Sequence, residues 1–196
     1  MPETGNSGQA SMQPWQIAIF VLGSAALGYI SRRSLTRPRS HGFYRFFAWE
    51  FILALGLLNL PYWFAEWRAW HQLISWVLLI ACILPLWLGV QALRQRGKPD
   101  ATQRSEPGLL AFERTSQLVT DGVYRYIRHP LYSSLFILAW GIFFKEPSWV
   151  GLGLACAASA LLVAMARCDE AECTQVFGAA YRQYMGRTRM FIPYVF

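Results

Sequence analysis

The fold of this chain is decided at Gly122-Val123-Tyr124-Arg125-Tyr126-Ile127-Arg128-His129-Pro130-Leu131-Tyr132, where a basic and aromatic loop runs into an apolar segment. Proline disfavours the α conformation in the residue before it and suits the first position of a helix, so a helix is predicted to begin at Pro130. The first turn of a helix presents backbone N–H groups and the positive end of the helix dipole. The stretch therefore predicts a membrane entrance that can bind a small polar ligand with an anionic group.

The composition around this stretch is typical of a membrane protein. The chain has 196 residues, of which 55% are hydrophobic and only 15% charged, and its mean hydropathy is +0.26. This balance is too apolar for an ordinary soluble domain. Residues 1–13 carry no Lys or Arg, so they lack the positive start of a signal peptide and are expected to be a retained flexible tail. Residues 14–196 are expected to form a single membrane domain.

Long apolar segments predict an all-α integral membrane protein with about five transmembrane helices. The segments comprise residues 15–30, 46–67, 73–93, 131–144 and 148–166. Pro61 is expected to kink or end its helix, and segment 73–93 is the clearest span, interrupted only by Pro85. The turn Lys145-Glu146-Pro147 separates the last two segments, which are expected to form a tight helical hairpin.

A cytoplasmic amphipathic helix is predicted near the C-terminus. Four apolar positions recur there at the spacing of one helix face, namely Phe177, Ala180, Tyr181 and Tyr184. Gly186 or its neighbours are expected to end this helix, which can lie back over the membrane face. Residues 191–193 are then expected to return to the bilayer surface.

Lys and Arg are distributed unevenly between the two predicted ends of the spans. Five follow the first span, seven lie between residues 94 and 128 and four after residue 166, which leaves only Arg68 and Lys145 of the 18. The positive-inside rule then places the N-terminus outside and the C-terminus in the cytoplasm. The Lys and Arg residues that give the net charge of +7 flank the membrane spans, so membrane lipids are their expected partners. This position argues against nucleic acid as a partner.

Further motifs accompany the central stretch at fixed order and spacing. They are Leu118-Val119, Gly122 with Tyr124, Arg128-His129-Pro130-Leu131-Tyr132, Asp169-Glu170, and Phe177-Gly178 with Tyr181. This series resembles the integral-membrane methyltransferase family that includes isoprenylcysteine carboxyl methyltransferase, with the phospholipid methyltransferases as more distant relatives. The resemblance implies methyl transfer from S-adenosyl-L-methionine to a lipid-like or small apolar acceptor.

The resemblance also implies a set of cofactor-binding residues, within residues 101–132 and 167–196. They are Gln117, Leu118, Val119, Tyr124, His129, Pro130, Leu131, Tyr132, Asp169 and, beside these, Glu170. S-Adenosylmethionine needs a partner for its amino group, donors for its carboxylate and aromatic surface for its sulfonium and adenine. The acid pair, the start of the predicted helix and the two tyrosines are residue types that meet these needs.

The predicted catalytic residues are Arg167 and Glu170. Methyl transfer from a sulfonium requires alignment and exclusion of water rather than a protein nucleophile. Arg167 can orient an anionic acceptor, although a cytoplasmic arginine beside a span also serves as a topology signal. Glu170 or His129 can take a proton if the acceptor is an amine. The acid pair can also be no more than a solvated helix end.

Several functions remain open at this stage. An isoprenylcysteine carboxylate is the favoured acceptor, and a phospholipid amine or a small thiol is the alternative within the enzyme class. A non-catalytic membrane transport or assembly protein is the alternative of another class. The acid pair together with an intact Arg-His-Pro-x-Tyr motif favours the enzyme, because a lapsed enzyme need not keep both.

Neither the cysteines nor the isolated histidines predict a metal site. The four cysteines lack His or Cys partners at ligand spacing, so they predict neither a disulfide nor a zinc site. His41 and His71 stand near the ends of predicted spans and are expected to be solvated or interfacial. No metal is therefore expected.

Overall fold

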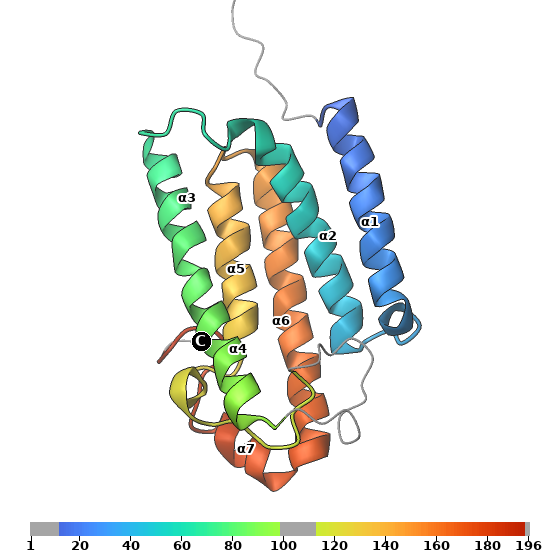
Figure 1. Cartoon of the computed structure of the whole chain (residues 1–196), viewed down its shortest axis with the longest axis vertical. Helices are drawn as coiled ribbons and strands as arrows, with labels where there is room; N and C mark the ends of the chain where they lie inside the picture. Colours follow the sequence, from blue (N-terminus) through green and yellow to red (C-terminus); the bar gives the residue numbers. More distant parts are fainter. Residues whose placement is uncertain (1–11, 99–112, 195–196) are drawn as a thin grey trace, which may run out of the picture.

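The computed structural model describes residues 12–98 and 113–194, and every regular element within these ranges is a helix (Figure 1). The helices are α1 (Pro14–Leu35), α2 (His41–Asn59), α3 (Trp70–Ala81), α4 (Ile83–Arg96), α5 (Pro130–Phe143), α6 (Trp149–Phe177) and α7 (Ala179–Met185), with 3-10 turns η1 (Leu60–Tyr62) and η3 (Gly122–Arg125). Four of the described helical segments are long and apolar enough to cross a membrane: Pro14–Leu35, His41–Tyr62, Trp70–Arg96 and Trp149–Phe177. The predicted all-α membrane fold is confirmed.

The fifth predicted span is α5, a helix of 14 residues. A full crossing needs about 20 residues, so α5 is too short to span the bilayer alone. It contacts α2, α3, α4 and α6, and it lies between α3 and α6 in Figure 1. A short turn joins it to α6, as the hairpin prediction requires. Because α5 is shorter than the neighbouring segments His41–Tyr62, Trp70–Arg96 and Trp149–Phe177, its first residues lie among protein segments rather than at the end of the bundle.

Two prolines mark helix ends where the sequence predicts them. Helix α2 ends at Asn59, two residues before Pro61. The long apolar segment 73–93 is divided at Cys82 between α3 and α4. Pro85 has no N–H group for the carbonyl of Ala81, which explains the break.

Helix α6 is longer than the sequence predicts. It continues past residue 166 to Phe177, because its polar last turns are bonded to other elements and no helix breaker occurs before Gly178. Gly178 has φ 59° and ψ −129°, a backbone conformation that favours glycine, and it redirects the chain into α7. The C-terminal helix therefore begins at Ala179 rather than at Phe177, and it ends before Gly186 as predicted.

Buried polar side chains join the apolar helices. Asn59 of α2 donates to the carbonyl oxygen of Ile142 at 2.8 Å, and Ser75 of α3 donates to that of Gly141 at 2.7 Å. Gln16 of α1 donates to the carbonyl oxygen of Leu57. Hydrogen bonds of this kind hold helices together where lipid removes the hydrophobic drive for association.

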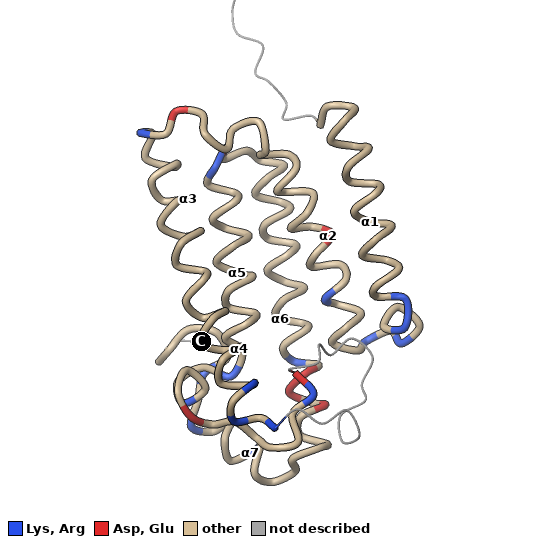
Figure 2. The backbone as a smooth tube through the Cα atoms, viewed as in Figure 1, with Lys and Arg blue, Asp and Glu red and all other residues tan. Residues whose placement is uncertain are grey.

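Basic residues gather at one end of the bundle. Figure 2 shows most of the Lys and Arg positions around α7, the end of α4 and the loop between α1 and α2. The opposite end, where α2 leads towards α3 and α5 turns into α6, carries few. This arrangement agrees with the uneven distribution read from the sequence, and the orientation across the membrane stays a prediction.

Candidate functional site

A cavity lies at the start of α5, at the basic end of the bundle. Its walls come from α4, the loop before η3, η3 itself, α5, α6 and α7. Eight of the residues predicted to bind a cofactor line it: Leu118, Val119, Tyr124, His129, Pro130, Leu131, Tyr132 and Asp169. Residues far apart in the sequence therefore meet around one space.

The cavity opens beside a second, wider hollow. The cavity measures about 80 Å³ and the hollow about 630 Å³, and Leu118 and Tyr184 line both. Arg125 and Arg187 contribute to the wall of the hollow. Small-molecule sites measure about 300–1,000 Å³, so a nucleoside-sized ligand that enters the cavity also occupies part of the hollow.

The C-terminal segment holds the start of α5 in place. Pro130 is the first residue of α5, and His129 before it lies outside the α region with φ −124° and ψ 61°. The N–H of Arg128 donates to the carbonyl oxygen of Arg189 at 2.8 Å, and the N–H of His129 donates to that of Met190 at 3.1 Å. The His129 amide is thus already bonded, so it does not serve as one of the free donors predicted at this helix start.

The side chain of Arg128 also holds the start of α5 in place. Its Nε donates to Oε1 of Glu170 at 2.6 Å, and one terminal nitrogen donates to the carbonyl oxygens of Met185 and Thr188 at 3.2 and 2.5 Å. Both side chains of the ion pair are mostly buried, with 11% and 15% exposed. Arg128 therefore joins α5, α6 and the end of α7.

Asp169 and an aromatic pair form the polar wall of the cavity. Tyr132 donates its hydroxyl to Oδ2 of Asp169 at 3.1 Å. The ring of His129 stacks on Tyr132 with centroids 5.1 Å apart and planes 6° apart. Nδ1 of His129 lies 3.6 Å from Asp169, and its Nε2 lies 3.3 Å from Glu170. Since both ring nitrogens face carboxylates, the ring can donate to both only when it is protonated.

Tyrosines from η3 and α7 close the opposite wall. Gly122 has φ +64°, a left-handed conformation that begins η3 and suits glycine. Tyr184 donates its hydroxyl to the carbonyl oxygen of Tyr124 at 2.7 Å. Burial raises the pKa of Tyr124, Tyr181 and Tyr184 above the usual value for a phenol, so all three stay neutral at physiological pH.

Three of the predicted site residues do not line the cavity. Gln117 is exposed, and its backbone N–H donates to the carbonyl oxygen of Gly97 at 3.2 Å. Glu170 lies behind the wall, where it holds Arg128 and His129. Arg167 is exposed on α6, outside the cavity wall. The functional roles assigned to these residues stay predictions.

The cavity is also lined by residues that were not predicted to bind the cofactor: Leu93, Glu113, Thr115, Arg128, Cys173, Phe177, Tyr181 and Tyr184. The sequence could have predicted part of this set, because Cys173 and Phe177 follow Asp169 at intervals of four and so lie on the same helix face. The spacing of Tyr181 and Tyr184 indicated an amphipathic helix, and both are buried against the cavity. No local pattern marks Glu113 or Thr115.

The C-terminal residues also depart from expectation. Phe191 is 6% exposed and packs in a core cluster with Ala48, Tyr132 and Leu162, so it does not return to the bilayer surface. Ile192 beside it is half exposed. The reason is the backbone pairing of this segment with residues 126–129, which directs Phe191 inward.

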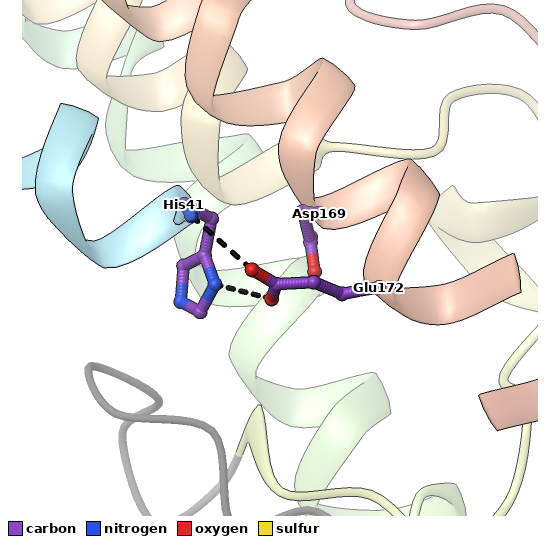
Figure 3. A group of neighbouring side chains, drawn as sticks. All are labelled: His41, Asp169 and Glu172. Carbon is purple, nitrogen blue, oxygen red and sulfur yellow. Dashed lines mark hydrogen bonds and ion pairs between the residues drawn. The ribbon is translucent and has the colours of Figure 1, made fainter. Parts of the chain in front are cut away.

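A further polar cluster joins α2 to α6. Figure 3 shows His41 facing Glu172, with Asp169 beside it. Nδ1 of His41 lies 2.5 Å from Oε2 of Glu172, and its backbone N–H donates to Oε1 at 3.3 Å. His41 is 1% exposed, so the expectation of a solvated or interfacial histidine is wrong. Candidate ligand atoms of the three residues lie within 4.8 Å of one another, which the bond to Glu172 explains without an ion; the absence of a metal stays a prediction.

Comparison with known proteins adds one match. The family model described as phospholipid methyltransferase matches residues 79–180, slightly more than half of the chain. The matched range contains all of α4, α5 and α6, with the last residues of α3 and the first of α7, and it leaves α1 and α2 outside. No curated protein and no solved structure matches the chain.

Proposed function

This chain belongs to the phospholipid methyltransferase family, and we propose that it methylates a lipid-type acceptor that presents a carboxylate, of the isoprenylcysteine kind. Membership of the family makes it a membrane methyltransferase that uses S-adenosyl-L-methionine. The alternative of a non-catalytic transport or assembly protein therefore falls away. The carboxylate acceptor rests on the site and on the sequence resemblance to isoprenylcysteine carboxyl methyltransferases.

The residues of the cavity fit the cofactor of this family. Asp169 offers a carboxylate to the amino group of S-adenosylmethionine, and Tyr124, Tyr132 and Tyr181 offer aromatic surface to its sulfonium and adenine. Leu118 and Val119 offer apolar surface. The bound cofactor supplies a methyl group on a positively charged sulfur. These side chains orient it and exclude water from the reacting atoms.

The observation that carries the choice of acceptor is the engagement of both candidate bases. The carboxylate of Glu170 is held by Arg128 at 2.6 Å, and His129 lies between Asp169 and Glu170. Neither group is placed as a free proton acceptor. A carboxylate acceptor is already ionised at neutral pH and needs no base, whereas an ammonium acceptor must first lose a proton. Glu170 then acts as a positioning residue for Arg128 and His129.

Two other acceptors compete with the carboxylate. A phospholipid amine agrees with the name of the family model, and it requires His129 or Glu170 to be released from its present partners. A small thiol needs a base of the same kind unless it arrives as a thiolate. Arg167, exposed near the site, remains available to steer an anionic acceptor towards the cavity by its charge.

The distribution of charge supports an orientation for the reaction. We propose that the end of the bundle with α7 faces the cytoplasm, where the cofactor is dissolved, and that the N-terminus lies outside. The acceptor reaches the cavity sideways from the lipid, because the surrounding helices expose apolar side chains.

An acceptor screen tests the function. Purified protein is incubated with S-adenosylmethionine labelled in its methyl group and with one of three acceptors: an S-farnesylcysteine, phosphatidylethanolamine in vesicles, or an alkane thiol. Label in an ester that base hydrolyses supports the carboxylate acceptor. Label in the phospholipid or the thioether instead contradicts it. Calorimetry with S-adenosylhomocysteine measures cofactor binding separately from turnover.

A further inference from the structure

Helix α2 carries a buried cation close to the cavity. Arg45 lies on the second turn of α2 and is only 7% exposed. A charged side chain within a membrane-spanning helix is costly and usually faces the protein interior or a water-filled space. Nothing in the family match explains it, because residues 79–180 exclude α2.

Arg45 reaches the cavity through Glu113. One of its terminal nitrogens lies 3.5 Å from Oε2 of Glu113, and Glu113 lines the cavity together with Tyr132 and Asp169. A separation of 3.5 Å is long for a charged hydrogen bond, which is usually 2.7–2.9 Å. The guanidinium group has five N–H donors, and this loose contact is its one ion pair among the described residues. Most of its donors therefore stay available to a ligand.

A second donor stands beside the guanidinium group. Trp49 follows Arg45 by one helical turn, and the guanidinium carbon lies 5.2 Å from the centre of its ring. The indole Nε1 of Trp49 is buried and has no hydrogen-bond partner within the described part of the chain. Leaving a buried donor without an acceptor costs about 1–3 kcal/mol. A ligand with an acceptor oxygen removes this cost.

The same face of α2 touches the cavity wall. Ala48 packs in one cluster with Tyr132 and Leu162, and Tyr44 packs against that cluster. His41, Arg45 and Trp49 follow one another at intervals of four, so they form one polar stripe along the helix. Nδ1 of His41 is bonded to Glu172, and its Nε2 is buried without a hydrogen-bond partner among the described residues. Arg45 is the member of the stripe that carries a guanidinium charge, and Trp49 is the member beside it with an unpartnered donor.

We propose that Arg45 and Trp49 recognise the oxyanion of the methyl acceptor, and that this oxyanion replaces Glu113 as the partner of Arg45 when the acceptor binds. The inference rests on the proposed function and names the feature by which the site selects its acceptor. The oxyanion is the carboxylate of a lipidated cysteine or the phosphate of a phospholipid. A guanidinium group binds a carboxylate or a phosphate through two parallel hydrogen bonds, a bidentate geometry that the ammonium group of a lysine cannot reproduce.

Binding of matched charged and neutral ligands tests the proposal. The protein, saturated with S-adenosylhomocysteine in a maltoside detergent, is titrated calorimetrically with N-acetyl-S-farnesylcysteine and with its carboxamide. A second pair, dodecyl phosphate and dodecanol, provides the phosphate source. The parent is expected to prefer the charged member of at least one pair by about tenfold or more. The pair that shows the preference identifies the source of the oxyanion.

Variants assign the preference to α2. Arg45→Gln is expected to abolish it, Arg45→Lys to retain only part of it, and Trp49→Phe to weaken it. Arg96→Gln, a change to an exposed arginine at the end of α4, is the control and should retain the preference. Unchanged binding of S-adenosylhomocysteine shows that each variant is folded.

Two results overturn the proposal: equal affinity for the charged and neutral members of both pairs, or a preference that survives Arg45→Gln. Failure of the proposed function would be seen in the acceptor screen instead, where the parent protein would transfer no methyl group to any of the acceptors. Because the titration needs no turnover, a protein that binds the oxyanion through Arg45 without methylating it still supports the role of Arg45.

Discussion

His41 of α2 and Glu172 of α6 are bonded twice, through the imidazole Nδ1 at 2.5 Å and through the backbone N–H at 3.3 Å. The pair lies beside Asp169 and is largely buried, with 1% and 19% of the side chains exposed. It therefore fixes the position of α2, which carries Arg45, against α6, which carries Asp169. Glu172 lies close to Asp169-Glu170 in the sequence but has a separate structural role, because it bonds to α2.

Glu172→Gln and His41→Ala are expected to destabilise the protein. Each change removes one partner of a buried pair, which costs about 1–3 kcal/mol when the other partner is left without its bond. The double variant should lose less unfolding free energy than the two single variants together, because either single change already breaks the bond between the two side chains. Unfolding of the detergent-solubilised protein by heat or denaturant measures all three losses. Additive losses would show that the two residues do not interact.

The acid pair should divide into a ligand-binding member and a positioning member. Asp169→Asn is expected to raise the dissociation constant of S-adenosylmethionine by about tenfold or more, with little change in apo stability, since asparagine can still accept from Tyr132. Glu170→Gln is expected to lower stability as well, because it removes the charge that holds Arg128. Calorimetry and thermal unfolding of both variants make the comparison. Normal cofactor binding by Asp169→Asn would place the pocket elsewhere.

Local rules account for what the sequence predicts well. The helix start at Pro130, the turn after α5 and the breaks near Pro61 and Pro85 depend on residues within a few positions of each other. The long-range contacts have no such signal. His41 and Glu172 are 131 residues apart, and Arg128 and Thr188 are 60 residues apart. Their pairing follows from the way the helices pack, so the residues around His41 and Phe191 in the sequence do not predict that these two side chains are buried.

The C-terminal segment offers a matched test of its newly found role. Phe191→Ala is expected to destabilise the protein by about 3–5 kcal/mol, because Phe191 is buried against Tyr132 and Leu162. It should also weaken cofactor binding, since residues 189 and 190 hold the backbone of Arg128 and His129. Ile192→Ala is the control, because Ile192 is half exposed and should cost about 0.5 kcal/mol or less. Equal effects of the two changes would contradict the inward packing of Phe191.

The orientation across the membrane can be tested with single cysteines. In a background without the four native cysteines, Gln95→Cys and Gly186→Cys are expected to be shielded from an impermeant thiol reagent in sealed cells. Ala65→Cys and Glu146→Cys, at the opposite end, should be labelled. Gly97 is unsuitable, since a Cβ there would lie 2.3 Å from the side chain of Thr115 and 2.6 Å from the carbonyl oxygen of Leu93. Labelling of Gln95→Cys without permeabilisation would reverse the proposed orientation.

Lys145, in the turn between α5 and α6, predicts a pH dependence of stability. Its side chain is fully buried, its Nζ lies 3.5 Å from the centre of the Trp76 ring, and it donates to Gln72 Oε1 at 3.1 Å and to the carbonyl oxygen of Trp63 at 3.2 Å. Burial lowers the pKa of Lys145 below its usual value. A lowered folded-state pKa means that the unfolded chain binds more protons between that pKa and about 10.4, so stability rises with pH across this window.

As pH increases through the alkaline range up to about 9.5, the melting temperature of the parent is therefore expected to change in the favourable direction relative to that of Lys145→Met, because only the parent gains the contribution of this lysine. Measurement stops there because the buried tyrosines, whose pKa is raised, reverse the sign once the unfolded phenols ionise near pH 10. Lys98→Met is the matched control: Lys98 is exposed, so this substitution should leave the dependence of the melting temperature on pH as it is in the parent. If Lys145→Met and the parent show the same slope, the charge of Lys145 carries no burial cost, and its contacts with Trp76 and Gln72 compensate fully for the loss of water.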